Sequence, residues 1–169
     1  MDAIAVVSDL FSRGRDVFKM IDALTLDELH EPPAPSIAWQ VWRMGRSLDH
    51  NFSPLLKRDQ LWITDSWHQR FDLPADDKDF QPGFPPANDL VTSFRVVDKQ
   101  QLADYFDATY ALVTEYLATL TLDDLDTEID AHRYAAPPTI GIRLVSVGSS
   151  ISHSAGAIRY RNWMAGRKT

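Results

Sequence analysis

A serine-rich stretch near the C-terminus holds the first side chains whose spacing suits chemistry. Residues 146–156 read SVGSSISHSAG, with five serines, one histidine and two glycines between the flanks IGIRLV and AIRYRNWM. The flanks predict one long helix over about residues 140–164. Ser150 and Ser154 lie one turn apart on such a helix, so their hydroxyl groups share a face. Where large apolar groups are expected, the stretch predicts a small polar surface toward a neighbouring helix.

The five histidines are the candidate metal ligands, because the chain has no cysteine. No two of them have the spacing of three or four residues that places two imidazoles on one helix face. A metal site assembled from His50, His132 and His153 is the alternative that the sequence leaves open. For each histidine alone, a hydrogen-bonded or exposed position is the favoured interpretation, and His30 is expected in solvent.

Other motif-defined chemistries are not supported by the sequence. The lack of cysteine excludes disulfides, cysteine-ligated zinc and a cysteine nucleophile. The serines have no G-x-S-x-G elbow, and neither a phosphate-binding loop nor a dinucleotide fingerprint occurs. An acidic cluster of Asp123, Asp124 and Asp126 is typical of a solvated helix start. A hydrolase triad and a nucleotide site are therefore not expected.

Length and composition indicate one folded domain over residues 1–169. The chain is 44% hydrophobic and 24% charged, as globular proteins are. The net charge of -7 and the pI of about 5.1 disfavour nucleic acid and anionic membranes as partners, because both need basic surfaces. The N-terminus lacks a signal-peptide pattern, and no apolar run reaches the roughly 20 residues that span a membrane. We expect a cytoplasmic protein that binds a small molecule.

The first half of the sequence predicts two long helices joined by a proline-rich turn. Apolar residues recur at helical spacing over residues 4–24, with Gly14 as a weak point. The capping-box sequence TLDE at residues 25–28 begins a short helix, which the sequence EPPAP ends. Ser36 caps the second long helix, whose apolar side continues to Phe52.

The second half repeats this order of elements. Asp98 caps a helix whose apolar side continues to Leu120, and the sequence LTLDDL echoes LTLDEL of the first half. The last long helix follows another proline pair. Helix, capping sequence, proline turn and helix therefore occur twice, which predicts an all-α four-helix bundle.

A long, aromatic-rich connection over roughly residues 57–97 lies between helices 2 and 3 of this bundle. Its aromatic side chains include Trp62, Trp67, Phe71, Phe80 and Phe84. We expect it to cover one end of the bundle, with short helical turns near residues 59–71 and 87–94. An apolar ligand site lined by the same aromatic side chains is the alternative.

Three stretches resemble the DinB-like superfamily of bacterial four-helix proteins, most closely its mycothiol-transferase-like branch. They are VWRMGRSLD at residues 41–49, QLWITDSWHQRFDLP at 60–74, and PPTIGIRLVSV at 137–147 with the downstream His153, Ala155, Gly156 and Tyr160. The resemblance implies an up-down-down-up bundle and, in many members, a dimer. It also implies a divalent metal held by three histidines and, in some members, thiol-dependent S-transfer with mycothiol, bacillithiol or glutathione.

Three other residues stand where the resemblance implies the metal-binding histidines. Arg43 occupies the position on helix 2, and Ser150 and Ser154 occupy the two positions on helix 4. A guanidinium stays protonated and does not bind a metal, and a serine hydroxyl is a poor ligand for a transition ion. We therefore predict a metal-free polar pocket, without a cofactor, in which Arg43 faces the serines and holds an anionic or carbonyl group. A decayed site filled by packing is the alternative.

Four further residues are predicted to surround this pocket, namely Trp39, Asp49, His50 and His153. His50 lies two helical turns beyond the arginine of helix 2, and His153 reaches the rim. The acidic position of Asp49 is expected, from the resemblance, to orient Arg43 or Arg46. Trp39 is expected as core or pocket wall.

Three functions are consistent with these features. The first is a transferase-like enzyme of unassigned substrate, with a low-molecular-weight thiol as candidate co-substrate. The second is a non-catalytic protein that binds a small molecule or forms a homodimer on the same scaffold. The third is a metal-dependent thiol S-transferase with a rearranged histidine site.

Overall fold

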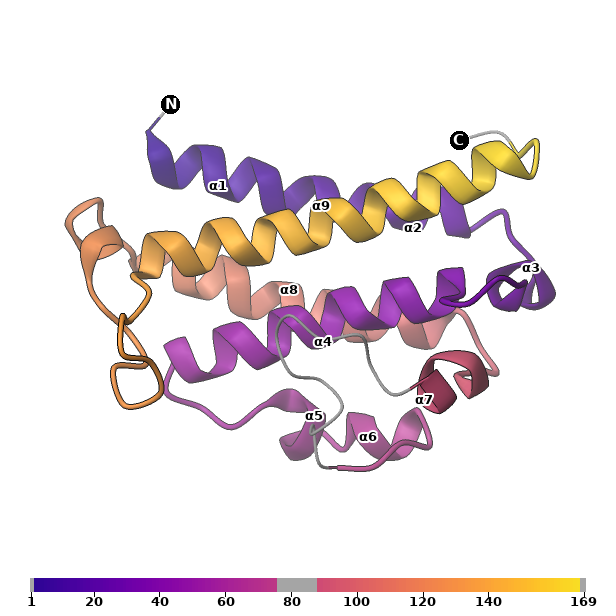
Figure 1. The fold of residues 1–169 in the computed structure, drawn as a ribbon, viewed down its shortest axis with the longest axis horizontal. Coiled ribbons are helices and arrows are strands. Elements are labelled where there is room, and N and C mark those ends of the chain that lie inside the picture. The colour runs from indigo at the N-terminus through magenta and orange to yellow at the C-terminus, as the bar shows by residue number, and fades with distance from the viewer. Residues whose placement is uncertain (1, 76–87, 168–169) are drawn as a thin grey trace.

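The computed structural model describes residues 2–75 and 88–167, and helices dominate both ranges (Figure 1). The α-helices are α1 (Ala3–Ser12), α2 (Asp16–Ile21), α3 (Leu26–His30), α4 (Ile37–Leu55), α5 (Leu61–Thr64), α6 (Trp67–Arg70), α7 (Asn88–Ser93), α8 (Gln100–Thr119) and α9 (Ile140–Met164). Two 3₁₀ turns cover Arg13–Arg15 and Asp123–Asp126. No β-strand occurs in these ranges, and one isolated bridge joins Glu128 to Thr139. The all-α prediction is therefore confirmed.

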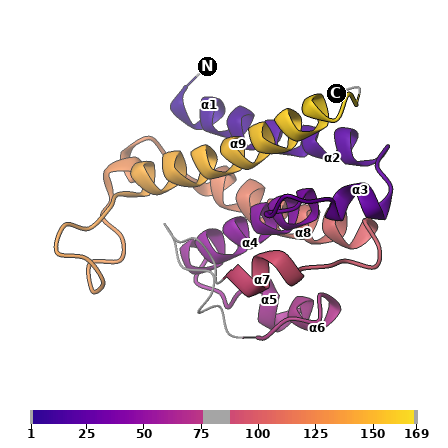
Figure 2. The ribbon, with the colours of Figure 1, turned by 45° about the vertical axis from the view of Figure 1, so that its right-hand side comes forward.

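The long helix α4 is the centre of the fold. It packs against both α8 and α9, and 14 of its 19 residues are buried. Figures 1 and 2 show α1 and α2 running alongside α9, away from the small helices α5 and α6. None of the described helices is long and apolar enough to cross a membrane.

Local capping determines where the helices begin. Thr25 and Glu28 form the predicted capping box of α3, with the Thr25 amide 2.9 Å from Glu28 Oε2. Ser36 Oγ accepts a hydrogen bond from the Trp39 amide at the start of α4. The Thr139 hydroxyl plays the same part for α9, so this helix spans the range that its apolar flanks predict.

The first long helix is interrupted at its predicted weak point, Gly14. Between α1 and α2 the chain makes one 3₁₀ turn, where a single helix was expected. A Cβ built on Gly14 would lie 2.7 Å from Cγ2 of Ile151, so only glycine allows this close approach to α9. The close approach of the first helical segment to α9 at this point therefore requires glycine.

The aromatic connection covers a flank of the bundle, and the expectation that it covers an end is wrong. Its described side chains Trp62, Trp67 and Phe71 are buried, and all three rings pack against Tyr105 of α8 with centroids 5.0–5.9 Å apart. Phe80 and Phe84 lie outside the described residues. The helical turns expected near residues 59–71 and 87–94 are present as α5, α6 and α7. The aromatic side chains that are described fill a core.

Candidate functional site

Helices α4 and α9 run antiparallel, and two polar contacts set their register. Near one end, Arg143 Nη1 donates to Asn51 Oδ1 at 3.1 Å. Near the other end, Arg161 Nη1 donates to the Pro35 carbonyl oxygen at 2.8 Å. Arg161 also donates to the Glu31 carbonyl oxygen at 2.6 Å. The start of α4 therefore lies beside the end of α9.

This register brings the three residues predicted on helices 2 and 4 to one level of the bundle. Arg43 precedes Asn51 by eight residues, and the residue eight positions after Arg143 is Ile151. At equal rise per residue, Arg43 is level with the turn that separates Ser150 from Ser154. Both serines also share the face of α9 that carries Arg143 and its contact to α4. We call this region the α4–α9 seam.

Arg43, on α4 at this level, has a guanidinium without a partner among the described residues. Its side chain is half-buried, and it makes no hydrogen bond or ion pair with any residue in 2–75 or 88–167. Ser154 is 8% exposed and Ser150 is half-buried. Ser47, one turn after Arg43 on the same face, adds a buried hydroxyl that the sequence analysis missed although its spacing indicates it.

Asp49 has a bracing position rather than a place in a pocket. Its carboxylate is 0% exposed, and Oδ1 accepts from the Ser53 hydroxyl at 2.8 Å and from the Leu61 amide at 2.9 Å. Oδ2 accepts from the Trp62 amide at 2.8 Å. These bonds satisfy free amides at the start of α5 and hold that helix on α4.

The arginine that Asp49 orients is Arg46, which completes a buried network. Nη1 of Arg46 lies 3.5 Å from Asp49 Oδ2 and donates to Gln60 Oε1 at 2.9 Å and to the Tyr105 hydroxyl at 3.3 Å. The guanidinium also lies over the Trp62 ring, 4.4 Å from its centroid. Burial raises the pKa of Tyr105 well above its ordinary value, so the phenol stays protonated as a donor.

The histidines do not assemble a metal site in the described part of the chain. His50 is half-buried on α4, whereas His153 on α9 and His132 in the preceding loop are exposed. Among residues 2–75 and 88–167, no group of three histidine, aspartate or glutamate side chains is placed to hold a metal ion. The rearranged site from His50, His132 and His153 is therefore not formed by these residues.

Trp39 lies in one of its two expected surroundings, whereas His30 does not. Trp39 is buried against Trp42 and Phe94, with ring centroids 4.7 and 5.5 Å away, so it belongs to the aromatic core. His30 is partly buried, and its Nε2 lies 3.2 Å from the Val96 amide nitrogen. The expectation that His30 lies in solvent is wrong, because it joins the end of α3 to the segment after α7.

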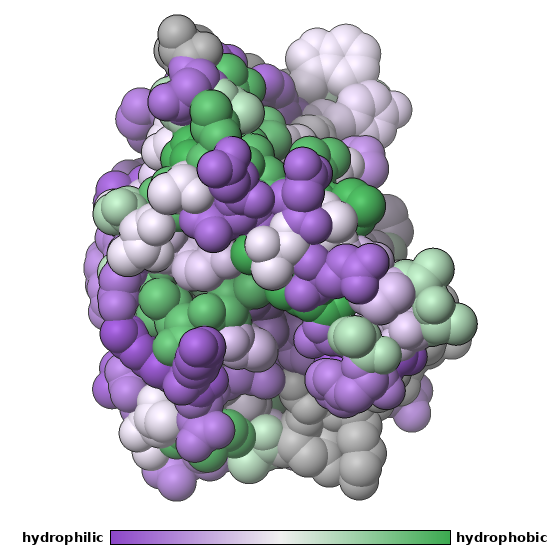
Figure 3. Space-filling view, turned by 90° about the vertical axis from the view of Figure 1, so that its left-hand side faces the viewer, coloured by the Kyte–Doolittle hydropathy of each residue, from purple (hydrophilic) through white to green (hydrophobic). Residues whose placement is uncertain are grey.

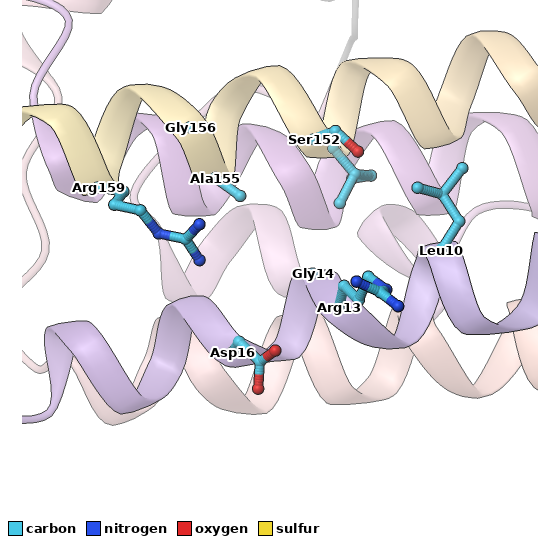
Figure 4. Close-up of a pocket in the computed structure, with 9 residues that line it drawn as sticks. Leu10, Arg13, Gly14, Asp16, Ser152, Ala155, Gly156 and Arg159 are labelled. Atoms are coloured by element: carbon cyan, nitrogen blue, oxygen red, sulfur yellow. The ribbon is translucent and has the colours of Figure 1, made fainter. Parts of the chain in front are cut away.

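A cavity lies on the opposite flank of α9, between this helix and the first helical segment (Figure 4). Its volume is 240 Å³, and it is lined by Leu10, Arg13, Gly14, Asp16, Ile151, Ser152, Ala155, Gly156 and Arg159. The serine-rich stretch thus divides between two flanks of α9. Ser150 and Ser154 lie toward α4, and Ser152 lies toward α1. Sequence analysis missed this cavity because it depends on how α1 and α9 are placed.

The all-α fold agrees with that of a DinB-type protein. The sequence profile of the DinB superfamily matches residues 11–149, so the chain belongs to the DinB superfamily. It is 29% identical to a conserved protein from Enterococcus faecalis whose crystal structure is known, with a TM-score of 0.85 over 99% of each chain. A search of curated proteins gives no match.

Proposed function

We propose that this chain is a transferase-like DinB-superfamily enzyme that binds a small molecule bearing a carboxylate or carbonyl group in the α4–α9 seam. The single observation that supports this is the Arg43 guanidinium, half-buried and without a partner in the described residues. Its level matches the turn between Ser150 and Ser154, whose hydroxyls offer further hydrogen bonds. The planar guanidinium donates two parallel hydrogen bonds to a carboxylate or polarises a carbonyl oxygen.

A low-molecular-weight thiol is the proposed co-substrate, by analogy with the thiol-dependent relatives. The chain contains no cysteine, so a nucleophilic sulfur has to come from the co-substrate. The guanidinium of Arg43 then holds the electrophile or the carboxylate of the thiol in place. Incubation with glutathione or mycothiol and a chromogenic aryl halide measures S-transfer directly.

The decisive experiment is a ligand screen by NMR with small carboxylates and thiols, repeated with Arg43→Gln. Loss of one charge-assisted hydrogen-bonding group is expected to weaken binding by about 1.5–3 kcal/mol. Arg133→Gln is the matched control, because it removes the same charge from an exposed loop. Equal binding by wild type and Arg43→Gln rejects the proposed site. One equivalent of tightly bound nickel or zinc in the purified protein rejects its metal-free character.

Homodimer formation is a second candidate function, favoured by the outer face of α9. Ile142, Val145, Tyr160 and Trp163 are 57–65% exposed. Ile142 and Trp163 are equally far from the midpoint between Ser152 and His153, and so are Val145 and Tyr160. When two copies of α9 pack antiparallel, Ile142 of one copy therefore faces Trp163 of the other, and Val145 faces Tyr160. A two-fold interface requires this kind of pairing.

Apolar side chains are visible among polar ones at the end of the molecule where α9 begins (Figure 3). Sedimentation of wild type and Trp163→Glu tests the idea, because a charge at the interface is expected to shift a dimer to monomer. A wild-type monomer at high micromolar concentration contradicts it.

The up-down-down-up order of the four long helices is likewise our proposal for the topology. It is supported by the antiparallel register of α4 and α9 and by the helix directions traced in Figure 1. The short α5, α6 and α7 then form the crossover that lets α4 and α8 run in one direction.

A further inference from the structure

The cavity between α1 and α9 is independent of the α4–α9 seam. Ser152 and Ser154 are two residues apart, so their side chains project about 200° apart around the helix axis. The cavity residues Leu10 and Gly14 come from the first helical segment, which takes no part in the proposed seam. A ligand in this cavity therefore does not contact Arg43 or its serines.

Two close contacts and one open position between α9 and the first helical segment explain why a cavity forms here. Gly148 and Gly14 let the helices touch, because a Cβ on either would lie 2.6 or 2.7 Å from the opposite side chain. About two turns beyond Gly148 on α9, a Cβ on Gly156 would meet nothing within 4 Å. The small side chain of Ala155 leaves the adjacent space open as well. The helices are thus held together at one end and separated beyond it.

The lining of the cavity combines apolar side chains with charged ones. Leu10, Ile151 and Ala155 provide the apolar lining, while Arg13 and Arg159 stand at the mouth from opposite helices (Figure 4). Arg159 makes no hydrogen bond or ion pair with any described residue. The guanidinium of Arg13 contacts Asp9 at 2.8 Å, on the exposed surface of α1.

The acidic residue at the mouth does not neutralise both arginines. Asp16 is already paired with Lys19 at 2.8 Å. The pKa of Asp16 is lowered chiefly by Lys19, and the charges of Arg159 and Arg13 add to this effect. Both guanidinium groups therefore stabilise a negative charge at this mouth, and Arg159 is available to bind one.

We propose that the cavity binds a small organic monocarboxylate, with its apolar body against Leu10, Ile151 and Ala155 and its carboxylate on Arg159. The fork of the guanidinium matches the two oxygens of a carboxylate. A volume of 240 Å³ equals that of about eight liquid water molecules, which suits an acid of roughly ten non-hydrogen atoms. The hydroxyl of Ser152 donates to the Gly148 carbonyl oxygen at 2.9 Å, so its proton is used within α9 and the carboxylate is left to Arg159.

Calorimetric titration with benzoate tests the proposal, because benzoate combines a carboxylate with an apolar ring of suitable size. Saturable one-to-one binding in the micromolar to low millimolar range is expected. Benzyl alcohol lacks the charge and inorganic phosphate lacks the apolar body, so both are expected to bind at least about tenfold more weakly. Failure of benzoate to bind, or equally strong binding of phosphate, overturns the proposal.

Three variants locate the bound benzoate. Arg159→Gln is expected to weaken binding about tenfold to a hundredfold, and Ala155→Leu, which fills the cavity, is expected to abolish it. Arg43→Gln tests whether benzoate binds in the α4–α9 seam instead. Loss with Arg43→Gln but not with Arg159→Gln would assign benzoate to the seam and overturn the inference. Arg159 is exposed, so this variant folds even where Ala155→Leu does not, and unchanged benzoate affinity in Arg159→Gln contradicts the proposal by itself.

Discussion

The phenol of Tyr105 on α8 donates a 2.9 Å hydrogen bond to Oδ2 of Asp49 on α4. Both side chains are almost fully buried, and the same carboxylate oxygen accepts the Trp62 amide. One carboxylate thus links two long helices to the aromatic connection. Removing a donor leaves the buried Asp49 carboxylate with fewer hydrogen bonds. The resulting loss of folding free energy is larger than the net contribution of one hydrogen bond.

Tyr105→Phe is therefore expected to lower the free energy of unfolding by about 1–3 kcal/mol. The ring contacts with Trp62, Trp67 and Phe71 remain, so the loss reports the hydroxyl group. Urea denaturation followed by tryptophan fluorescence measures it. Tyr160→Phe, on the exposed face of α9, is the control and is expected to change stability little. Equal stability of Tyr105→Phe and wild type would show that Asp49 does not need this donor.

Two glycine substitutions of the same kind are expected to have opposite signs. Gly14→Ala places a methyl group 2.7 Å from Ile151 Cγ2, closer than van der Waals contact allows, so a loss of about 1–3 kcal/mol is expected. Gly156→Ala meets open space in the middle of α9, so a gain of about 0.5–1 kcal/mol is expected from helix propensity. Parallel thermal and urea unfolding measures both changes. Destabilisation by both substitutions would contradict the open space at Gly156.

The helix boundaries were predictable because their causes are local. Thr25 with Glu28, Ser36 and Thr139 each satisfy amides within three residues, so the sequence contains the whole interaction. The range of α9 was predictable for the same reason, because its cap, Thr139, directly precedes it in the sequence. The requirement for glycine at Gly14 was only partly predictable, because it depends on Ile151 in a helix far along the chain.

The contents of the interior were less predictable, because they depend on packing between distant segments. Arg46 and Asp49 are three residues apart on α4, which indicates an ion pair, but the docking of α5 is what buries it. The seam residues Arg43, Ser150 and Ser154 were found through the family resemblance, and the cavity at Arg159 was not found at all. In the sequence, this cavity corresponds only to a small residue close to an arginine on α9. That pattern indicates a cavity only when α1 is known to lie beside it.

Protonation of His30 is expected to make folding pH-dependent. Burial lowers the pKa of His30 below its ordinary value of 6.5, although the hydrogen bond to the Val96 backbone opposes this effect. Below pH 6.5 the unfolded chain therefore binds a proton that the folded chain resists, so stability falls as the pH falls toward the folded pKa.

Urea denaturation between pH 7.5 and about 5 measures this dependence. His30→Gln is expected to make the slope of unfolding free energy against pH shallower, whereas His153→Gln, on the exposed side of α9, is expected to leave it unchanged. An identical slope in His30→Gln and wild type would assign the pH dependence to other groups.

Asn162 presents the opposite situation from Asp49, a buried polar group without compensation. Its side chain on α9 is 1% exposed, and neither its Oδ1 nor its Nδ2 has a hydrogen-bond partner among the described residues. Leucine has a similar size and needs no partner, so Asn162→Leu is expected to raise the free energy of unfolding by about 1–3 kcal/mol. Asn51→Leu is the matched control, because the Asn51 amide donates to the Ser47 carbonyl oxygen at 2.8 Å and accepts from Arg143 at 3.1 Å. That variant is expected to lose stability. A loss in both variants would mean that Asn162 binds a buried water molecule, whose bonds leucine cannot replace.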